Sequence, residues 1–141
     1  MRDVDIVVVG AGPAGLAAEA ACGRAGAETL VVDFMNDPGG QLIKQTHKFF
    51  GSERQYAGVR GVQIPRIFLD EISSMPNVTM MWGMNASGYF EDGTLALENQ
   101  SNFYKIKPKR LIIATGAGEK SLTFENNDLP GVYGAGAVQT L

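Results

Sequence analysis

The apolar positions of the first 33 residues follow two different periods. Residues 5–9 (DIVVV) are apolar and β-branched on both faces, which predicts a central strand covered on both sides, as in a parallel sheet. Residues 13–25 are small or helix-favouring, and Gly26 is a plausible end of that helix. The helix is expected to set a flat face on the sheet, made of Ala14, Ala17, Ala18 and Ala21. A second buried strand, 29–32, ends at Asp33, so the pattern predicts a βαβ unit.

The middle of the chain loses this regularity and then regains it. Residues 34–61 have little periodicity and are too long for a simple connection, which favours a functional loop, and their aromatic content argues against disorder. From about Gln63 a helical stripe of apolar residues appears, made of Ile64, Ile67, Phe68, Ile72 and Met75. A strand at 78–82 follows, in which Met80, Met81 and Trp82 are expected to belong to strand and core.

Three short strands are predicted next, at 87–91, 94–98 and 103–107, with a turn at Asp92-Gly93 and a polar turn between the last two. This β-meander lies where a simple nucleotide-binding fold would place another helix. A buried strand at 111–114 then runs into Thr115-Gly116, and residues 118–141 are expected to be mostly irregular.

The turn between the first strand and the helix, residues 10–15 (GAGPAG), matches the G-x-G-x-x-G pattern. The first glycine permits the tight turn, the second lets backbone approach a pyrophosphate, and the third lets the helix pack on the strand. The helix N-terminus offers unpaired N–H groups and a partial positive charge to phosphates. Asp33, at the end of the next strand, can accept hydrogen bonds from ribose hydroxyls. The context favours a bound dinucleotide over a structural glycine turn.

An acidic residue at position 33 favours a ribose without a 2′-phosphate, so NADP is not expected in this site. This acidic residue is compatible with both NAD and FAD. The location of the glycine motif at the start of the chain favours FAD, and so does the meander.

The composition narrows the class of protein. The formal net charge of −3 gives no field that attracts nucleic acid or an anionic membrane, and we expect neither as a partner. No apolar stretch is long enough to span a membrane, and acidic residues near Met1 argue against a secretion signal. The single cysteine, Cys22, is expected to be a small buried residue in the first helix and suits a cytoplasmic location.

Four segments carry a resemblance to a known family: VVVGAGPAG (7–15), DPGGQL (37–42), IIATGA (112–117) and FENNDLPGVYGAGAVQTL (124–141). The first three, in this order, resemble the FAD-binding half of the pyridine nucleotide-disulfide oxidoreductase superfamily, nearest its thioredoxin-reductase-like branch. The last is similar to the FAD-carrying subunits of opine oxidase, sarcosine oxidase and hydrogen cyanide synthase. The resemblance implies an α/β fold: a Rossmann-like FAD-binding domain with a central parallel sheet and a three-stranded β-meander.

The resemblance also implies which residues contact FAD. The pyrophosphate would lie against Gly10, Gly12, Pro13, Ala14 and Gly15, and the adenosine ribose against Asp33. Gly40 and Gln41 would approach the pyrophosphate and ribityl chain, and Met84 or Asn85 would offer backbone to adenine. Thr46 resembles a flavin-contacting threonine. Ala114, Thr115 and Gly116 would pass close to the cofactor where the chain leaves its strand. An ordinary turn is the alternative for residues 38–40.

Two departures from the family pattern matter. Many members place a redox cysteine pair after the second strand, but residues 39–51 contain no cysteine, so thiol-disulfide exchange within this chain is excluded. The family's FAD domain is also completed by a later segment, after an inserted NAD(P)H domain. We therefore expect residues 1–141 to be the N-terminal segment of an FAD-binding domain, truncated, with those two parts absent and the flavin pocket open on one side.

The predicted function is the FAD-binding part of a flavin-dependent oxidoreductase, which passes hydride or electrons between NAD(P)H or an amine-type substrate and an acceptor. Its partners would be the remaining domains or subunits of the parent enzyme. No catalytic residue is identified, because FAD performs the redox chemistry in such enzymes. No metal site is expected, because His47 is the only histidine. His47 either lies beside the flavin, where it could transfer a proton, or has a surface or packing role. The alternative is a non-catalytic NAD- or ADP-binding module.

Overall fold

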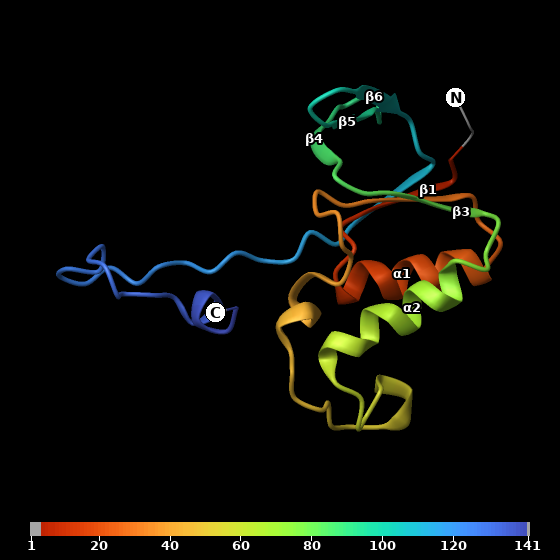
Figure 1. Ribbon diagram of the computed structural model, residues 1–141. Coiled ribbons are helices and arrows are strands. Elements are labelled where there is room, and N and C mark those ends of the chain that lie inside the picture. Colours follow the sequence, from red (N-terminus) through yellow and green to blue (C-terminus); the bar gives the residue numbers. More distant parts are fainter. Residues whose placement is uncertain (1–3, 141) are drawn as a thin grey trace.

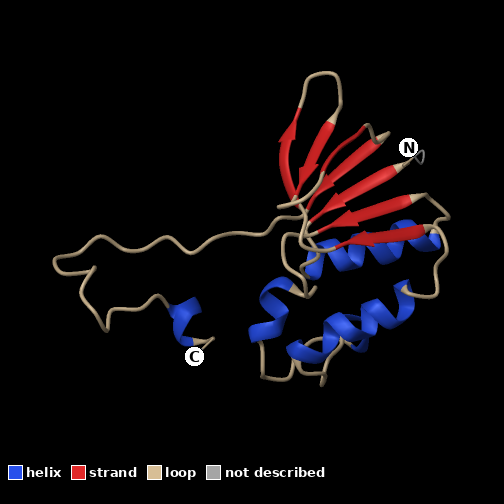
Figure 2. Ribbon diagram, turned by 45° about the horizontal axis from the view of Figure 1, so that its top comes forward, coloured by secondary structure: helices blue, strands red, loops and turns tan. Residues whose placement is uncertain are grey.

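A four-stranded parallel sheet forms the centre of the computed structural model, which describes residues 4–140. Its strands are β1 (Ile6–Val9), β2 (Thr29–Val32), β3 (Val78–Met81) and β7 (Arg110–Ile113), in the order β3-β2-β1-β7. Figure 2 shows these strands fanning out side by side. All three neighbouring pairs are parallel, which agrees with the unbroken apolar runs of β1 and β2. The predicted α/β class is confirmed.

Two helices, α1 (Pro13–Arg24) and α2 (Ile64–Ile72), cover one face of this sheet (Figure 1). The core beneath them includes Val8, Leu16 and Ile72. The expected alanine face of α1 is wrong for three of its four residues, and only Ala18 is partly buried against the core. Its buried residues are Gly15, Leu16, Glu19, Ala20 and Gly23, whereas Ala14, Ala17 and Ala21 are exposed.

Glycine explains which face of α1 is buried. A Cβ on Gly15 would overlap the carbonyl oxygen of Gly10, and a Cβ on Gly23 would meet the side chains of Met75 and Val78. The helix therefore approaches its neighbours most closely along the side that bears these two glycines. Alanine tolerates either a buried or an exposed position, so the spacing of alanines alone does not identify that side.

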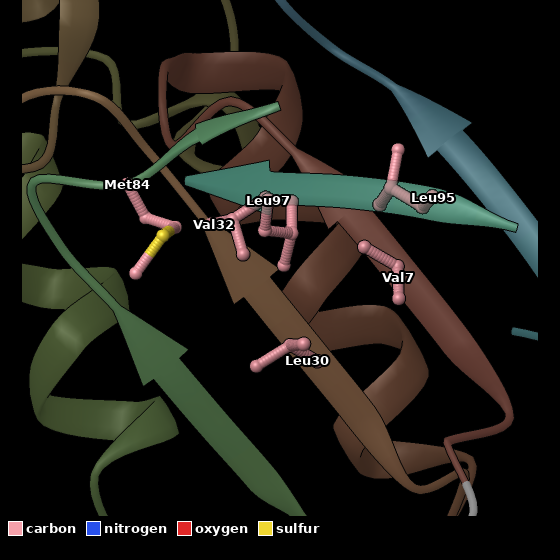
Figure 3. Packing of buried hydrophobic residues seen from close by; sticks show 6 residues of the cluster. All are labelled: Val7, Leu30, Val32, Met84, Leu95 and Leu97. Atoms are coloured by element: carbon pink, nitrogen blue, oxygen red, sulfur yellow. The ribbon is translucent and has the colours of Figure 1, made fainter. Parts of the chain in front are cut away.

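The second face of the parallel sheet is covered by the meander of β4 (Asn85–Tyr89), β5 (Leu95–Glu98) and β6 (Phe103–Ile106), an antiparallel sheet. Figure 3 shows the side chains of Leu95 and Leu97 on β5 directed towards Val7 and Val32 of the parallel sheet. Leu30 and Met84 complete this buried cluster. The molecule thus has three layers: meander, parallel sheet and helices.

Several element boundaries differ from the predicted ones. β4 lies at 85–89 rather than 87–91, because the turn begins at Phe90, whose N–H donates to the Thr94 carbonyl, and Asp92 accepts from the N–H of Thr94. α2 ends at Ile72, before the predicted Met75. The strand at 29–32 is confirmed residue for residue.

The long loop after β2 is ordered, as its aromatic content predicted. It contains three short 3-10 helices, η1 (Gly40–Lys44), η2 (Glu53–Gln55) and η3 (Gly61–Gln63). Between η1 and η3 the chain folds back on itself, and the Phe49 N–H donates to the Val59 carbonyl at 2.9 Å. The loop is therefore a folded segment that lies beside α2.

Beyond the sheet, residues 118–140 form an arm that extends away from the three layers (Figure 1). The arm is irregular except for α3 (Ala135–Val138), and its apolar residues, such as Leu122 and Phe124, are exposed. Among residues 4–140, no helix has the length and apolar character needed to cross a membrane.

Candidate nucleotide-binding cleft

The glycine turn lies where the carboxyl ends of β1 and β7 meet. The Gly10 N–H donates to the Val32 carbonyl and the Ala114 N–H to the Val9 carbonyl, both at 2.8 Å. Gly10 has a φ of +101°, and a Cβ at this position would strike the Ala114 carbonyl. Only glycine allows this turn and this close approach of two backbones. The GAGPAG and IIATGA segments are thus brought into direct contact.

The turn leads directly into α1, whose N-terminus has no side-chain cap among the described residues. Gly12 occupies the cap position in an extended conformation, Pro13 is the first helical residue, and the first turn contains no acidic side chain. Proline has no N–H and its fixed φ suits this position. The remaining N–H groups of the first turn have no partner within the helix and, with the helix dipole, favour an anionic group such as a phosphate.

Asp33 fixes this turn from the end of β2. Its carboxylate accepts hydrogen bonds from the N–H groups of Ala11 at 2.5 Å and Met35 at 2.8 Å, and the residue is only 8% exposed. Its backbone carbonyl accepts from the Met84 N–H at 2.9 Å. Each carboxylate oxygen has two acceptor sites, so these bonds leave capacity for a ribose hydroxyl. The structure adds a positioning role that the sequence did not indicate.

The DPGGQL segment is held against the glycine turn. The Gly39 N–H donates to the Ala11 carbonyl at 2.8 Å. Gly40 has a φ of +50°, and a Cβ there would lie 2.9 Å from the Gly12 Cα. Residues 38–40 are therefore more than an ordinary turn, because they dock η1 beside the N-terminus of α1.

These segments surround a cleft of about 800 Å³ at the carboxyl ends of the parallel strands. Such a volume falls within the range of ligand and cofactor sites, and open α/β sheets bind their ligands at this end. All but two of the predicted site residues line it, namely Gly10, Gly12, Pro13, Ala14, Asp33, Gly40, Gln41, Met84, Asn85, Ala114, Thr115 and Gly116.

The two predicted residues that do not line the cleft are Gly15 and Thr46. Gly15 is buried beneath the turn and supports it through close packing on Gly10. Thr46 is exposed, and its carbonyl accepts a hydrogen bond from Arg60. His47 also lies outside the cleft and stacks on Phe49, with ring centroids 5.3 Å apart.

The sequence did not indicate the other lining residues, namely Val9, Val32, Phe34, Met35, Asp37, Ile43, Lys44, Ala86, Ile113 and Ala117. Most of them adjoin a strand end or a residue that was identified, so adjacency to those positions was an available signal. The position of Lys44 depends on how η1 folds, which no pattern in the sequence indicates.

One ionisable group beneath the site has an altered proton affinity. Glu19 lies on the inner side of α1 with no exposed surface, and neither carboxylate oxygen has a hydrogen-bond partner among residues 4–140. Burial raises the pKa of Glu19 to about 7, because the charged form loses its hydration. Burial also raises the pKa of the half-buried Cys22, which argues against a reactive thiolate there.

The family model described as pyridine nucleotide-disulphide oxidoreductase matches residues 4–140, which is nearly the whole chain. The chain belongs to this family. The match agrees with the resemblance carried by the glycine turn, the DPGGQL segment and the IIATGA segment, which the structure places around one cleft.

Two curated proteins with sequences similar to this chain are subunits of oxidases. The alpha subunit of sarcosine oxidase from Rhizobium meliloti (strain 1021) is 33% identical over an alignment that covers 96% of this chain and 14% of the relative. An opine oxidase subunit from the same strain is 30% identical, and the alignment covers 97% of this chain and 30% of the relative. The chain thus spans less than a third of the length of either relative.

Solved structures show the same fold. L-proline dehydrogenase from P. horikoshii has a TM-score of 0.75 and 23% identity, and the match covers 92% of this chain and 26% of the dehydrogenase chain. Thioredoxin reductases are also among the structures that share this fold. At these identities the likeness shows the architecture of the chain and not its substrate.

Proposed function

We propose that the cleft binds FAD and that the chain is the FAD-binding part of a flavin-dependent oxidoreductase. The observation that carries the proposal is the uncapped N-terminus of α1, which opens towards a cleft where backbone of Gly12 and Gly40 come into contact. Without Cβ atoms, these positions let a pyrophosphate reach backbone N–H groups directly. Membership of the family and the flavin enzymes among its relatives support the same cofactor.

Each part of the cleft would hold one part of FAD. Gly10, Gly12, Pro13 and Ala14 would surround the pyrophosphate, with Gly15 supporting the turn from beneath. Asp33 would accept from the adenosine ribose. The remaining contacts would come from Gly40 and Gln41 to the pyrophosphate and ribityl chain, from Met84 or Asn85 to adenine, and from Ala114, Thr115 and Gly116 along the cofactor. A contact from Thr46 would require the flavin to extend beyond the cleft along the loop.

Bound FAD would supply hydride and electron transfer, while the chain's own residues position it. For the whole enzyme we propose NAD(P)H or an amine-type substrate as electron donor, and we favour the amine type. Subunits of sarcosine oxidase and opine oxidase are among the relatives, and this chain has no cysteine in residues 39–51 with which to exchange disulfides.

The rest of the enzyme would complete the site. We propose that residues 1–141 are the N-terminal segment of the FAD-binding domain, and that the NAD(P)H domain and the later FAD segment belong to other parts of the parent enzyme. The short share of each relative that the chain spans supports this proposal, as does Ile113, which is 71% exposed beside the cleft. We further propose a cytoplasmic location, which suits a chain with a single cysteine.

The proposal is tested on the parent enzyme purified from cells. We expect a yellow protein whose flavin absorption bleaches on anaerobic addition of NADH or of an amine or opine from a substrate panel. Binding of NAD⁺ with no uptake of FAD on reconstitution would instead establish a non-catalytic nucleotide-binding module.

A further inference from the structure

The cleft has an uneven set of charged side chains. Among the described residues that line it, Asp33 and Asp37 are acidic and Lys44 is the one basic residue. A cleft that takes a doubly charged pyrophosphate next to two carboxylates needs a positive group to offset the repulsion. The N-terminus of α1 supplies only about half an elementary charge.

The short helix that bears Lys44 packs against the glycine turn. It is the last residue of η1, whose first residue, Gly40, packs against Gly12. The hydrogen bond from Gly39 to Ala11 holds the start of η1 in the same place. Because a 3-10 helix has three residues per turn, Lys44 follows Gln41 on the same side, and both line the cleft.

The ammonium group of Lys44 is available for a ligand. The side chain is half-buried in the cleft wall, and within residues 4–140 it forms neither a hydrogen bond nor an ion pair. The nearby Lys48 differs, since it is exposed and does not line the cleft. Lys44 lines the same cleft as Asp33 and Asp37 and forms no ion pair with either of them, so its charge can interact with an anionic ligand in the cleft.

We propose that Lys44 is the side-chain countercharge that binds the pyrophosphate of the dinucleotide. The inference rests on the proposed FAD site and adds to it a residue whose positive charge interacts with the negatively charged phosphates of the ligand. It implies that Lys44 raises the affinity for ligands that carry phosphate groups. The adenosine part of the ligand is bound independently of this residue.

The test measures binding of ADP and of adenosine to the purified chain by NMR titration, for wild type, Lys44→Gln, Lys44→Arg and the control Lys48→Gln. We expect Lys44→Gln to weaken ADP binding about tenfold, as for loss of a charge-assisted contact, and to leave adenosine binding unchanged. Lys44→Arg should restore most of the ADP affinity, and Lys48→Gln should behave as wild type.

Two kinds of failure are distinguishable. If wild type binds ADP and Lys44→Gln binds it equally well, or if Lys48→Gln loses as much affinity as Lys44→Gln, the inference is wrong and the proposed site stands. Equal losses for ADP and adenosine also overturn it. If the wild-type chain does not bind ADP, the proposed nucleotide site fails, and the role of Lys44 fails with it.

Discussion

At the scale of single residues, Asp33 combines two tasks at one carboxylate. It accepts the N–H groups of Ala11 and Met35, and so determines the shape of the glycine turn before any ligand binds. The sequence indicated only the ribose contact, because a hydrogen bond between residues 22 positions apart cannot be inferred from a motif.

Replacement of Asp33 should therefore affect both stability and binding. We predict that Asp33→Ala lowers the free energy of unfolding by roughly 1–3 kcal/mol, because two N–H groups lose their acceptor, and also weakens ADP binding. Urea denaturation and ADP titration check the two effects. Asp37→Ala is the control, since Asp37 lines the same cleft without such bonds to the described residues, and its loss should leave stability unchanged. Equal stability of both variants would contradict the positioning role.

Glu19 predicts a pH dependence of stability. Its pKa in the folded chain, about 7, lies above the ordinary value of 4.5. As pH rises from about 4.5 to 7, the unfolded chain releases this proton first, so the group lowers stability progressively across that window and no further above it. The loss amounts to roughly 3 kcal/mol.

A Glu19→Gln variant has no such titration. Urea unfolding at about pH 5 and pH 8 should show a smaller drop in the free energy of unfolding for the variant than for wild type. Glu28→Gln removes an exposed carboxylate and serves as the control with a wild-type profile. A pH profile of Glu19→Gln that matches wild type would show that Glu19 is hydrated in solution.

At the scale of elements, the bounds of a strand were predicted most accurately where an apolar run is bounded by polar residues. Residues 29–32 are such a run and form β2 as predicted. β4 ends two residues before its predicted end, because the turn around Asp92 already begins at Phe90. The position of η1 could not be predicted, because it depends on contacts between Gly40 and Gly12 across the fold.

The meander is attached to the parallel sheet mainly through β5. Leu97 has no exposed surface and packs within the cluster that contains Val7 and Val32. We predict that Leu97→Ala lowers the free energy of unfolding by roughly 2–4 kcal/mol, through lost burial and the cavity that remains. Phe103→Ala on the exposed side of β6 should change it far less. Thermal and urea unfolding distinguish the two variants, and similar losses would contradict the layered packing.

At the scale of the whole molecule, the three layers and the arm are expected to behave differently. A side-chain hydrogen bond joins the arm to the loop after β2, from Gln139 to Gln45 at 3.5 Å, and arm residues such as Leu122 are exposed. We predict that removal of residues 118–141 changes the urea midpoint of unfolding only slightly and leaves the transition cooperative. A large drop in the midpoint would show that the arm packs on the layers in solution.

The three layers also account for the position of the cleft. The carboxyl ends of β1, β2 and β7 open on one side of the molecule, and the glycine turn, η1 and the segment before β4 meet there. Three of the four segments that carry the family resemblance, 7–15, 37–42 and 112–117, contribute residues to this cleft. The resemblance missed residues such as Lys44, whose contribution comes from the folding of the loop.

The central claim is that this cleft binds FAD through its ADP part, and competitive titration of the purified chain tests it most directly. FAD fluorescence is followed as the chain is added, and then ADP, NAD⁺ and NADP⁺ are each added as competitors. We predict saturable binding of FAD at one site per chain, displacement by ADP, and little displacement by NADP⁺. Failure of FAD to bind while NAD⁺ binds tightly would contradict the account.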